Sequence, residues 1–152
     1  MKEKSPIVWE KNITTFPSGQ TGEHYYDEVK GIHIIRIAPR ASTRLRLHEL
    51  AHAKLQGGLG NATTTDETAH REIEADMWAY SKQGRPYKLY PFLTHVVRPT
   101  IQNDARPNTL NLSKTYKYFL DLADEYDFEL SEKDKHTLWQ SIKEEIRRAR
   151  NK

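Results

Sequence analysis

Residues 42–56 read STRLRLHELAHAKLQ, a stretch without glycine or proline that is rich in leucine and alanine. This composition predicts a helix. Within it, His48-Glu49-Leu50-Ala51-His52 forms an H-E-x-x-H motif. A spacing of four places both imidazoles on one helix face, one turn apart, and Glu49 projects beside the pair. The stretch therefore predicts a helix that presents two metal-binding nitrogens with a carboxylate next to them.

A second helix is predicted from about Asp66 to Lys82. Thr64-x-x-Glu67 has the pattern of a capping box at its start, and Gly84 and Pro86 follow its end. At 100° per residue, Glu72 shares a face with small alanines, which permit close approach to a neighbouring helix. We expect this face to pack against the motif helix.

The second helix can supply the ligand that the motif lacks, because catalytic zinc usually takes three protein ligands and a water. Glu72 follows His52 by 20 residues and lies on the expected packing face. Asp76, one turn later on that face, is placed to accept the free N–H of a ligand imidazole. Glu74 points the other way and is the alternative ligand. The competing interpretation is a helix with two surface histidines beside an acidic helix that forms salt bridges.

The rest of the chain predicts further strands and helices. Residues 31–38 (GIHIIRIA) are β-branched and predict a strand, and Ile7-Val8-Trp9 indicates an extended segment. Residues 86–107 contain four prolines and are expected to form a structured loop. Two further helices are expected, over 113–126 and from the cap at Ser131 onward. We expect these elements to form one domain over 1–152, with 110–152 as its C-terminal helical part.

Composition restricts the classes of function. The chain has 152 residues, a net charge of +3 and no cysteine, so any metal must be held by histidines and carboxylates. The basic residues near the C-terminus are accompanied by Glu144 and Glu145, which favours a solvated helix face over a nucleic-acid surface. No long apolar segment is present, so we expect a cytoplasmic protein that binds neither membrane nor nucleic acid.

The remaining histidines are expected to be surface or packing residues. They are His24, His33, His70, His95 and His136. A metal site of this kind that hydrolyses a carbonyl compound also requires a hydrogen-bond donor for the oxyanion, and four side chains are candidates. They are Tyr80, Tyr90, His95 and Arg98.

The segments HELAHAKL (48–55) and EIEADMWAY (72–80) together resemble the gluzincin metallopeptidases, and most of all the ImmA/IrrE-like family. The resemblance covers about residues 31–80. It implies an α+β fold in which a small twisted sheet packs on the motif helix, beside the second metal-ligand helix and the two C-terminal helices. It implies a zinc ion between the two ligand helices, bound by His48, His52 and Glu72. It also implies that residues 31–38 form an edge strand at the rim of the site, able to pair with an extended peptide. The run after Ala75 departs from the family pattern, because Trp78 to Ser81 are followed by charged residues rather than an aliphatic run ending in proline.

These observations predict a zinc metallopeptidase in which Glu49 is the general base for a metal-activated water. The resemblance implies a protein or peptide substrate, of the kind represented by transcriptional repressors and stress regulators. No helix-turn-helix accompanies the motif. The alternative function is a zinc-containing regulatory or protein-binding module without general proteolytic activity, and a third is an interaction protein that recognises a partner through its C-terminal helices.

Overall fold

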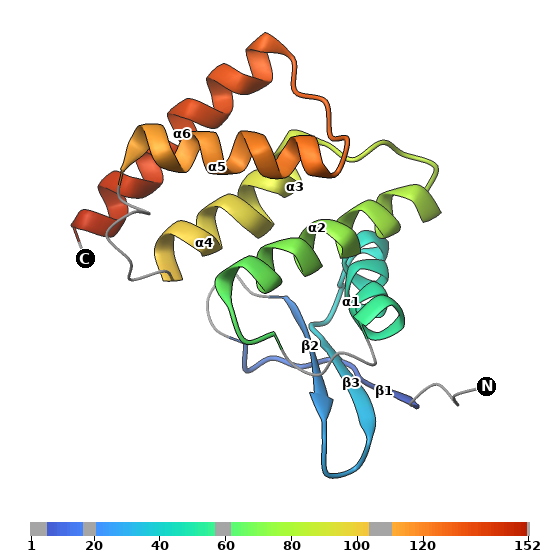
Figure 1. Cartoon of the computed structure of the whole chain (residues 1–152). Helices are drawn as coiled ribbons and strands as arrows, with labels where there is room; N and C mark the ends of the chain where they lie inside the picture. The colour runs from blue at the N-terminus through green and yellow to red at the C-terminus, as the bar shows by residue number, and fades with distance from the viewer. Residues whose placement is uncertain (1–5, 17–20, 57–61, 104–110, 152) are drawn as a thin grey trace. The chain divides into compact units, whose positions relative to one another are not determined.

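A computed structural model describes residues 6–16, 21–56, 62–103 and 111–151. Its mixed sheet and helices confirm the α+β class. The chain divides into two compact units, Met1–Pro86 and Tyr87–Lys152 (Figure 1). The single domain over 1–152 stays a prediction.

The first unit contains a three-stranded sheet of β1 (Ile7–Glu10), β2 (Gly22–Asp27) and β3 (Ile32–Ile37). The strand order is β1-β3-β2, with β1 parallel and β2 antiparallel to β3. The strand expected over 31–38 is therefore confirmed, but its expected position at the edge is wrong. Because β1 and β2 occupy both sides of β3, its backbone cannot pair with a peptide.

The two faces of the sheet differ in chemistry. On one face, Ile35 and Ile37 are almost fully buried and form a core with Ala53 of the motif helix. On the other face, Arg36 forms ion pairs with Glu10 at 3.2 Å and with Glu23 at 2.8 Å. This alternation follows from the two-residue period of a strand. The apolar face fixes the sheet against the motif helix.

Two helices pack on each other and complete the first unit. They are α1 (Thr43–Gln56) and α2 (Thr65–Lys82), and α1 also contacts β2 and β3 (Figure 1). At the start of α2 the hydroxyl of Thr64 accepts the backbone N–H of Glu67, as a capping residue does. The Glu67 carboxylate accepts the N–H of Thr63 rather than that of Thr64, so the predicted capping box is only half formed. Beyond the helix, Gly84 adopts a φ of +69°, a left-handed conformation that favours glycine.

The second unit begins with a helical segment where a loop was expected. α3 (Leu89–Phe92), the π-helical turn η1 (Leu93–Val97) and α4 (Arg98–Asn103) follow one another directly. Pro91 is tolerated because it lies in the first turn, where its missing N–H has no helical partner. The N–H of Arg98 bonds to the carbonyl of Leu93, five residues back, and this wide turn immediately precedes Pro99. The expectation of a loop over the described part of 86–107 was wrong because the prolines occupy positions that a helix can accept.

The unit is completed by α5 (Leu112–Glu125) and α6 (Glu132–Arg150), close to the two expected helices. Ser131 and Asp134 form a complete capping box at the start of α6. Phe92 packs against Phe119 and Phe128, with ring centroids 6.0 and 5.5 Å apart. Within the described residues, no helix is both long and apolar enough to cross a membrane.

Candidate metal centre

The packing of α1 on α2 brings His48, His52 and Glu72 together. The Nε2 atoms of the two imidazoles lie 3.1 Å apart. One carboxylate oxygen of Glu72 lies 2.9 Å from Nε2 of His48, and the other lies 3.1 Å from Nε2 of His52. The histidine side chains are 4% and 11% exposed and that of Glu72 is 26% exposed, so solvent reaches the group from the side of the carboxylate.

The opposite nitrogen of each imidazole is held by a partner. Nδ1 of His48 donates to Asp76, which is fully buried, over 2.6 Å. Nδ1 of His52 donates to the side-chain carbonyl of Gln56 over 2.7 Å. Because an ionised carboxylate and an amide oxygen only accept, both Nδ1 atoms carry a proton. In a neutral imidazole this leaves the lone pair on Nε2, and both lone pairs face Glu72.

Gln56 is a member of the site that the sequence analysis missed. Its amide N–H donates to the backbone carbonyl of Arg71 over 3.1 Å, so the side chain bridges α1 and α2 beside the ligands. The available signal was its position, since it follows His52 by four residues on the same helix face. Its uncharged amide is neither a usual metal ligand nor an acid, so the sequence pattern did not distinguish it.

Glu49 is buried beside these ligands but is not one of the three side chains that converge. It is 6% exposed, and a carboxylate oxygen lies 3.9 Å from Nε2 of His48. The alternative acid, Glu74, is exposed on α2 and does not belong to a metal-binding group of described residues that contains His48 or His52. Helical geometry therefore separates Glu72 from Glu74, as expected.

The group is strongly coupled electrostatically. Burial lowers the pKa of both His48 and His52, but the charge and hydrogen bonds of Glu72 outweigh it. Asp76 adds to the effect on His48, and the pKa of each imidazole lies above the ordinary 6.5. Burial raises the pKa of Glu72, but the two imidazoles outweigh it and hold that pKa far below the ordinary 4.5. Without a metal, the carboxylate and protonated imidazoles stabilise one another.

This arrangement can hold a metal ion. Two nitrogen lone pairs and a carboxylate converge on one point, and such electron-rich groups repel one another unless a proton or a cation lies between them. His48, His52 and Glu72 each offer one ligand atom, and these atoms lie within 4.8 Å of one another. Asp76 and Gln56 accept the Nδ1–H bonds of the two histidines, and such outer partners orient metal-binding histidines.

Two further histidines lie on the sheet beside this group. The ring of His24 stacks on that of His52, with centroids 5.8 Å apart and planes inclined by 13°. Nε2 of His24 lies 2.9 Å from Nδ1 of His33, which is buried. Burial, with smaller effects from His52 and His33, lowers the pKa of His24 to about 4. Sequence analysis treated both as packing or surface residues, because only the strand register brings His24 to α1.

Of the four expected oxyanion donors, Tyr80 belongs to the same unit as the metal group. Tyr80 is eight residues after Glu72, about 12 Å further along the helix axis, and Arg44 lies over its ring at 5.8 Å. Tyr90, His95 and Arg98 belong to the second unit, and their role stays a prediction.

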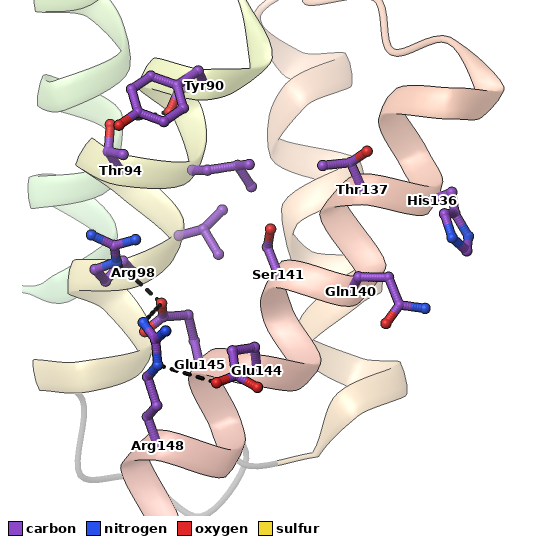
Figure 2. Close-up of a pocket in the computed structure, with 12 residues that line it drawn as sticks. Tyr90, Thr94, Arg98, His136, Thr137, Gln140, Ser141, Glu144, Glu145 and Arg148 are labelled. Atoms are coloured by element: carbon purple, nitrogen blue, oxygen red, sulfur yellow. Dashed lines mark hydrogen bonds and ion pairs between the residues drawn. The ribbon is translucent and has the colours of Figure 1, made fainter.

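A second buried acidic group lies in the second unit, beside a pocket between η1, α4 and α6 (Figure 2). Glu145 is 5% exposed and accepts from Arg98 over 3.1 Å and from Arg148 over 3.2 Å. The amide of Gln102 donates to the same carboxylate over 2.6 Å. Each of these three partners is a donor that carries its own hydrogens, so the charge is neutralised within the protein.

Comparison of the chain with protein-family models, curated proteins and solved structures finds no match.

Proposed function

We propose that this chain is a zinc metallopeptidase of the gluzincin type, with His48, His52 and Glu72 as zinc ligands. The observation that carries the proposal is the triangle of two Nε2 atoms and a carboxylate, with edges of 2.9 to 3.1 Å. The resemblance of residues 48–55 and 72–80 to the ImmA/IrrE-like family supports the same class. The proposed substrate is accordingly a protein or peptide, such as a repressor or stress regulator, and the proposed location is the cytoplasm.

Zinc fits the donor set better than magnesium or calcium. Two imidazoles and one carboxylate suit zinc, whereas the harder cations prefer oxygen ligands alone. Tetrahedral bonds of 2.0 to 2.2 Å separate neighbouring ligand atoms by about 3.3 Å. The observed edges are shorter by only a few tenths of an ångström, so small side-chain movements would open the triangle to that size.

Zinc bound there would polarise a peptide carbonyl and make a water molecule more acidic. Glu49 has the position of the general base, because it is buried next to the ligands without being one of them. It would accept a proton from the attacking water and then deliver that proton to the leaving amine. Asp76 and Gln56 keep both imidazoles oriented during these steps through their Nδ1–H bonds.

The test separates metal binding from proteolysis. Zinc-loaded wild type and Glu49→Gln are incubated with a proteome-derived peptide library, and new termini are identified by mass spectrometry. We expect both proteins to bind one zinc and only the wild type to cleave. Glu74→Gln, an exposed acid on α2, is the matched control and should cleave like the wild type. A wild type that binds zinc but cleaves no peptide would favour the regulatory or binding module.

A further inference from the structure

His24 reaches the proposed zinc site from the sheet rather than from the two ligand helices. It lies on β2, which packs against α1, and its ring is nearly parallel to that of His52. The nitrogens of His24 are not among the atoms that converge with His48 and Glu72. His24 therefore borders the ligand group without completing it.

The sheet register explains how His24 is held. His24 pairs with Ile35 and Tyr26 pairs with His33, so the two histidines are diagonal neighbours on one sheet face. Their rings stack at a centroid distance of 5.1 Å, and Nε2 of His24 and Nδ1 of His33 share a hydrogen bond of 2.9 Å. Two independent contacts, one with His33 and one with His52, thus fix the orientation of the ring.

One nitrogen of this oriented ring remains available. Nε2 of His24 is occupied by His33, whereas Nδ1 has no hydrogen-bond partner among the residues that the structure describes. The side chain is only partly buried, so the ring is accessible from solvent. A rigid imidazole with an available nitrogen beside a metal group is suited to contact a molecule bound there.

We propose that His24 is a catalytic residue whose Nδ1–H donates a hydrogen bond to the carbonyl oxygen of the bound substrate, with His33 as its positioning residue. The inference rests on the proposed function. In this proposal His33 carries its proton on Nδ1 and donates it to Nε2 of His24 over 2.9 Å, so that the proton of the neutral His24 ring is on Nδ1. The Nδ1–H of His24 would then donate to the oxygen on which negative charge develops when water attacks the carbonyl carbon.

The chemistry requires such a donor, because charge on the carbonyl oxygen increases from ground state to transition state. A hydrogen bond from a fixed imidazole strengthens as that charge develops. Removal of one oxyanion donor lowers kcat by about 10² to 10³ in other enzymes. The alternative role for His24 is packing, in which the ring only supports His52.

Replacement by phenylalanine separates these roles. His24→Phe keeps a flat ring against His52 but removes both nitrogens, whereas His24→Gln keeps an N–H donor without the ring. His70→Phe, on the α2 face opposite Glu72, is the matched control. Zinc affinity is measured by chelator competition, and folding by thermal unfolding. Binding of acetohydroxamate is measured by calorimetry, because its carbonyl and hydroxyl oxygens mimic the substrate carbonyl and the attacking water.

We expect His24→Phe to bind zinc within about threefold of the wild type but acetohydroxamate about 10-fold to 100-fold more weakly. On a peptide that the wild type cleaves, kcat should fall about 100-fold with little change in KM. His24→Gln should recover part of both losses, and His70→Phe should match the wild type.

Equal acetohydroxamate affinities in zinc-loaded wild type and His24→Phe, or no binding to either, would overturn the role of His24 while leaving the zinc site intact. A loss of zinc from His24→Phe equal to the loss of acetohydroxamate would assign the residue to packing. Absence of zinc from the wild type would instead refute the proposed function itself, so the two failures are distinguishable.

Discussion

Two buried polar groups, one in each unit, show opposite solutions to the burial of charge. In the second unit, the carboxylate of Glu145 is surrounded by Arg98, Gln102 and Arg148, which supply hydrogens of their own. In the first unit, Glu72 meets two imidazoles whose fixed protons are already donated to Asp76 and Gln56. The Glu72 group therefore requires an added proton or cation, whereas the charge of Glu145 is already balanced by its protein partners.

This contrast shows that burial of charged residues alone does not identify a functional site. Both groups combine an acid with basic side chains, and in both the carboxylate is largely shielded from water, with the side chains of Glu72 26% and Glu145 7% exposed. What differs is the direction in which lone pairs and hydrogens point. We expect substitutions in the first unit to act mainly on metal binding, and substitutions in the second unit to act on stability.

The largest effect is expected from loss of a ligand. Structural zinc sites contribute about 10 to 16 kcal/mol of binding free energy, so one ligand of three accounts for roughly 4 kcal/mol or about a thousandfold in affinity. We expect His48→Ala and His52→Ala each to weaken zinc binding by at least that factor in chelator competition. Glu145→Gln should bind zinc like the wild type. Unchanged zinc affinity in both histidine variants would remove the distinction between the two groups.

Zinc binding should depend strongly on pH. The pKa values of His48 and His52 are raised above 6.5, so zinc must displace a proton from each imidazole at lower pH. Affinity should increase by up to about 100-fold per pH unit while both are protonated, and level off above their pKa values. Competition titrations from about pH 5.5 to 8.5 measure this slope. A flat profile would mean that these imidazoles do not bind the ion.

The metal-free protein should show the opposite trend. A group whose pKa is raised on folding contributes stability that is complete below its unfolded pKa, here 6.5, and is lost as pH rises through the folded pKa. We expect the melting temperature in excess chelator to fall as pH rises above 6.5. The zinc-loaded protein should not share this loss. Chelator-treated His48→Ala, which lacks one of the two imidazoles, should show a smaller fall.

The outer partners are expected to matter less than the ligands. Removal of such a partner typically weakens metal binding by about 10-fold to 100-fold. The loss of zinc affinity in Asp76→Ala should lie near the upper end of this range, because a carboxylate accepts a stronger hydrogen bond than the amide of Gln56. Gln56→Ala should lie near the lower end, and Glu74→Ala should have no effect. If Glu74→Ala weakened zinc binding more than Glu72→Ala, the assignment of the third ligand would be reversed.

The smallest effect is expected in the second unit. Glu145→Gln keeps the shape of the side chain but weakens its bonds to Arg98 and Arg148, which are more than half exposed. We expect the free energy of unfolding to fall by about 1 to 2 kcal/mol, measured by urea titration. Zinc content should stay the same. A change in zinc content of this variant would contradict the separation of the two groups.

Local patterns in the sequence were sufficient to predict the helices α1, α2 and α6 and the strand β3. The H-E-x-x-H motif and the helical period together also placed Glu72 and Asp76 on the face that meets α1. These predictions succeeded because each depends on residues within one or two helical turns. The central position of β3 was not predicted, because strand order depends on pairing between distant segments.

Two further features could not be predicted from local sequence patterns. They are the helical segment 89–103 and the contact of His24 with His52. Proline content suggested a loop, but Pro91 lies in a first turn and Pro99 follows a π-helical turn. The position of His24 depends on the register of β2 with β3 and on the packing of α1 against the sheet. Neither feature is visible in a local pattern of residues.

The central claim is that His48, His52 and Glu72 bind one zinc ion. X-ray absorption spectroscopy at the zinc edge of the loaded protein tests it most directly. We predict a four-coordinate shell of nitrogen and oxygen at about 2.0 to 2.2 Å with the scattering pattern of two imidazoles, reduced to one imidazole in His52→Ala. A shell of six oxygens, or a spectrum unchanged in His52→Ala, would contradict the account.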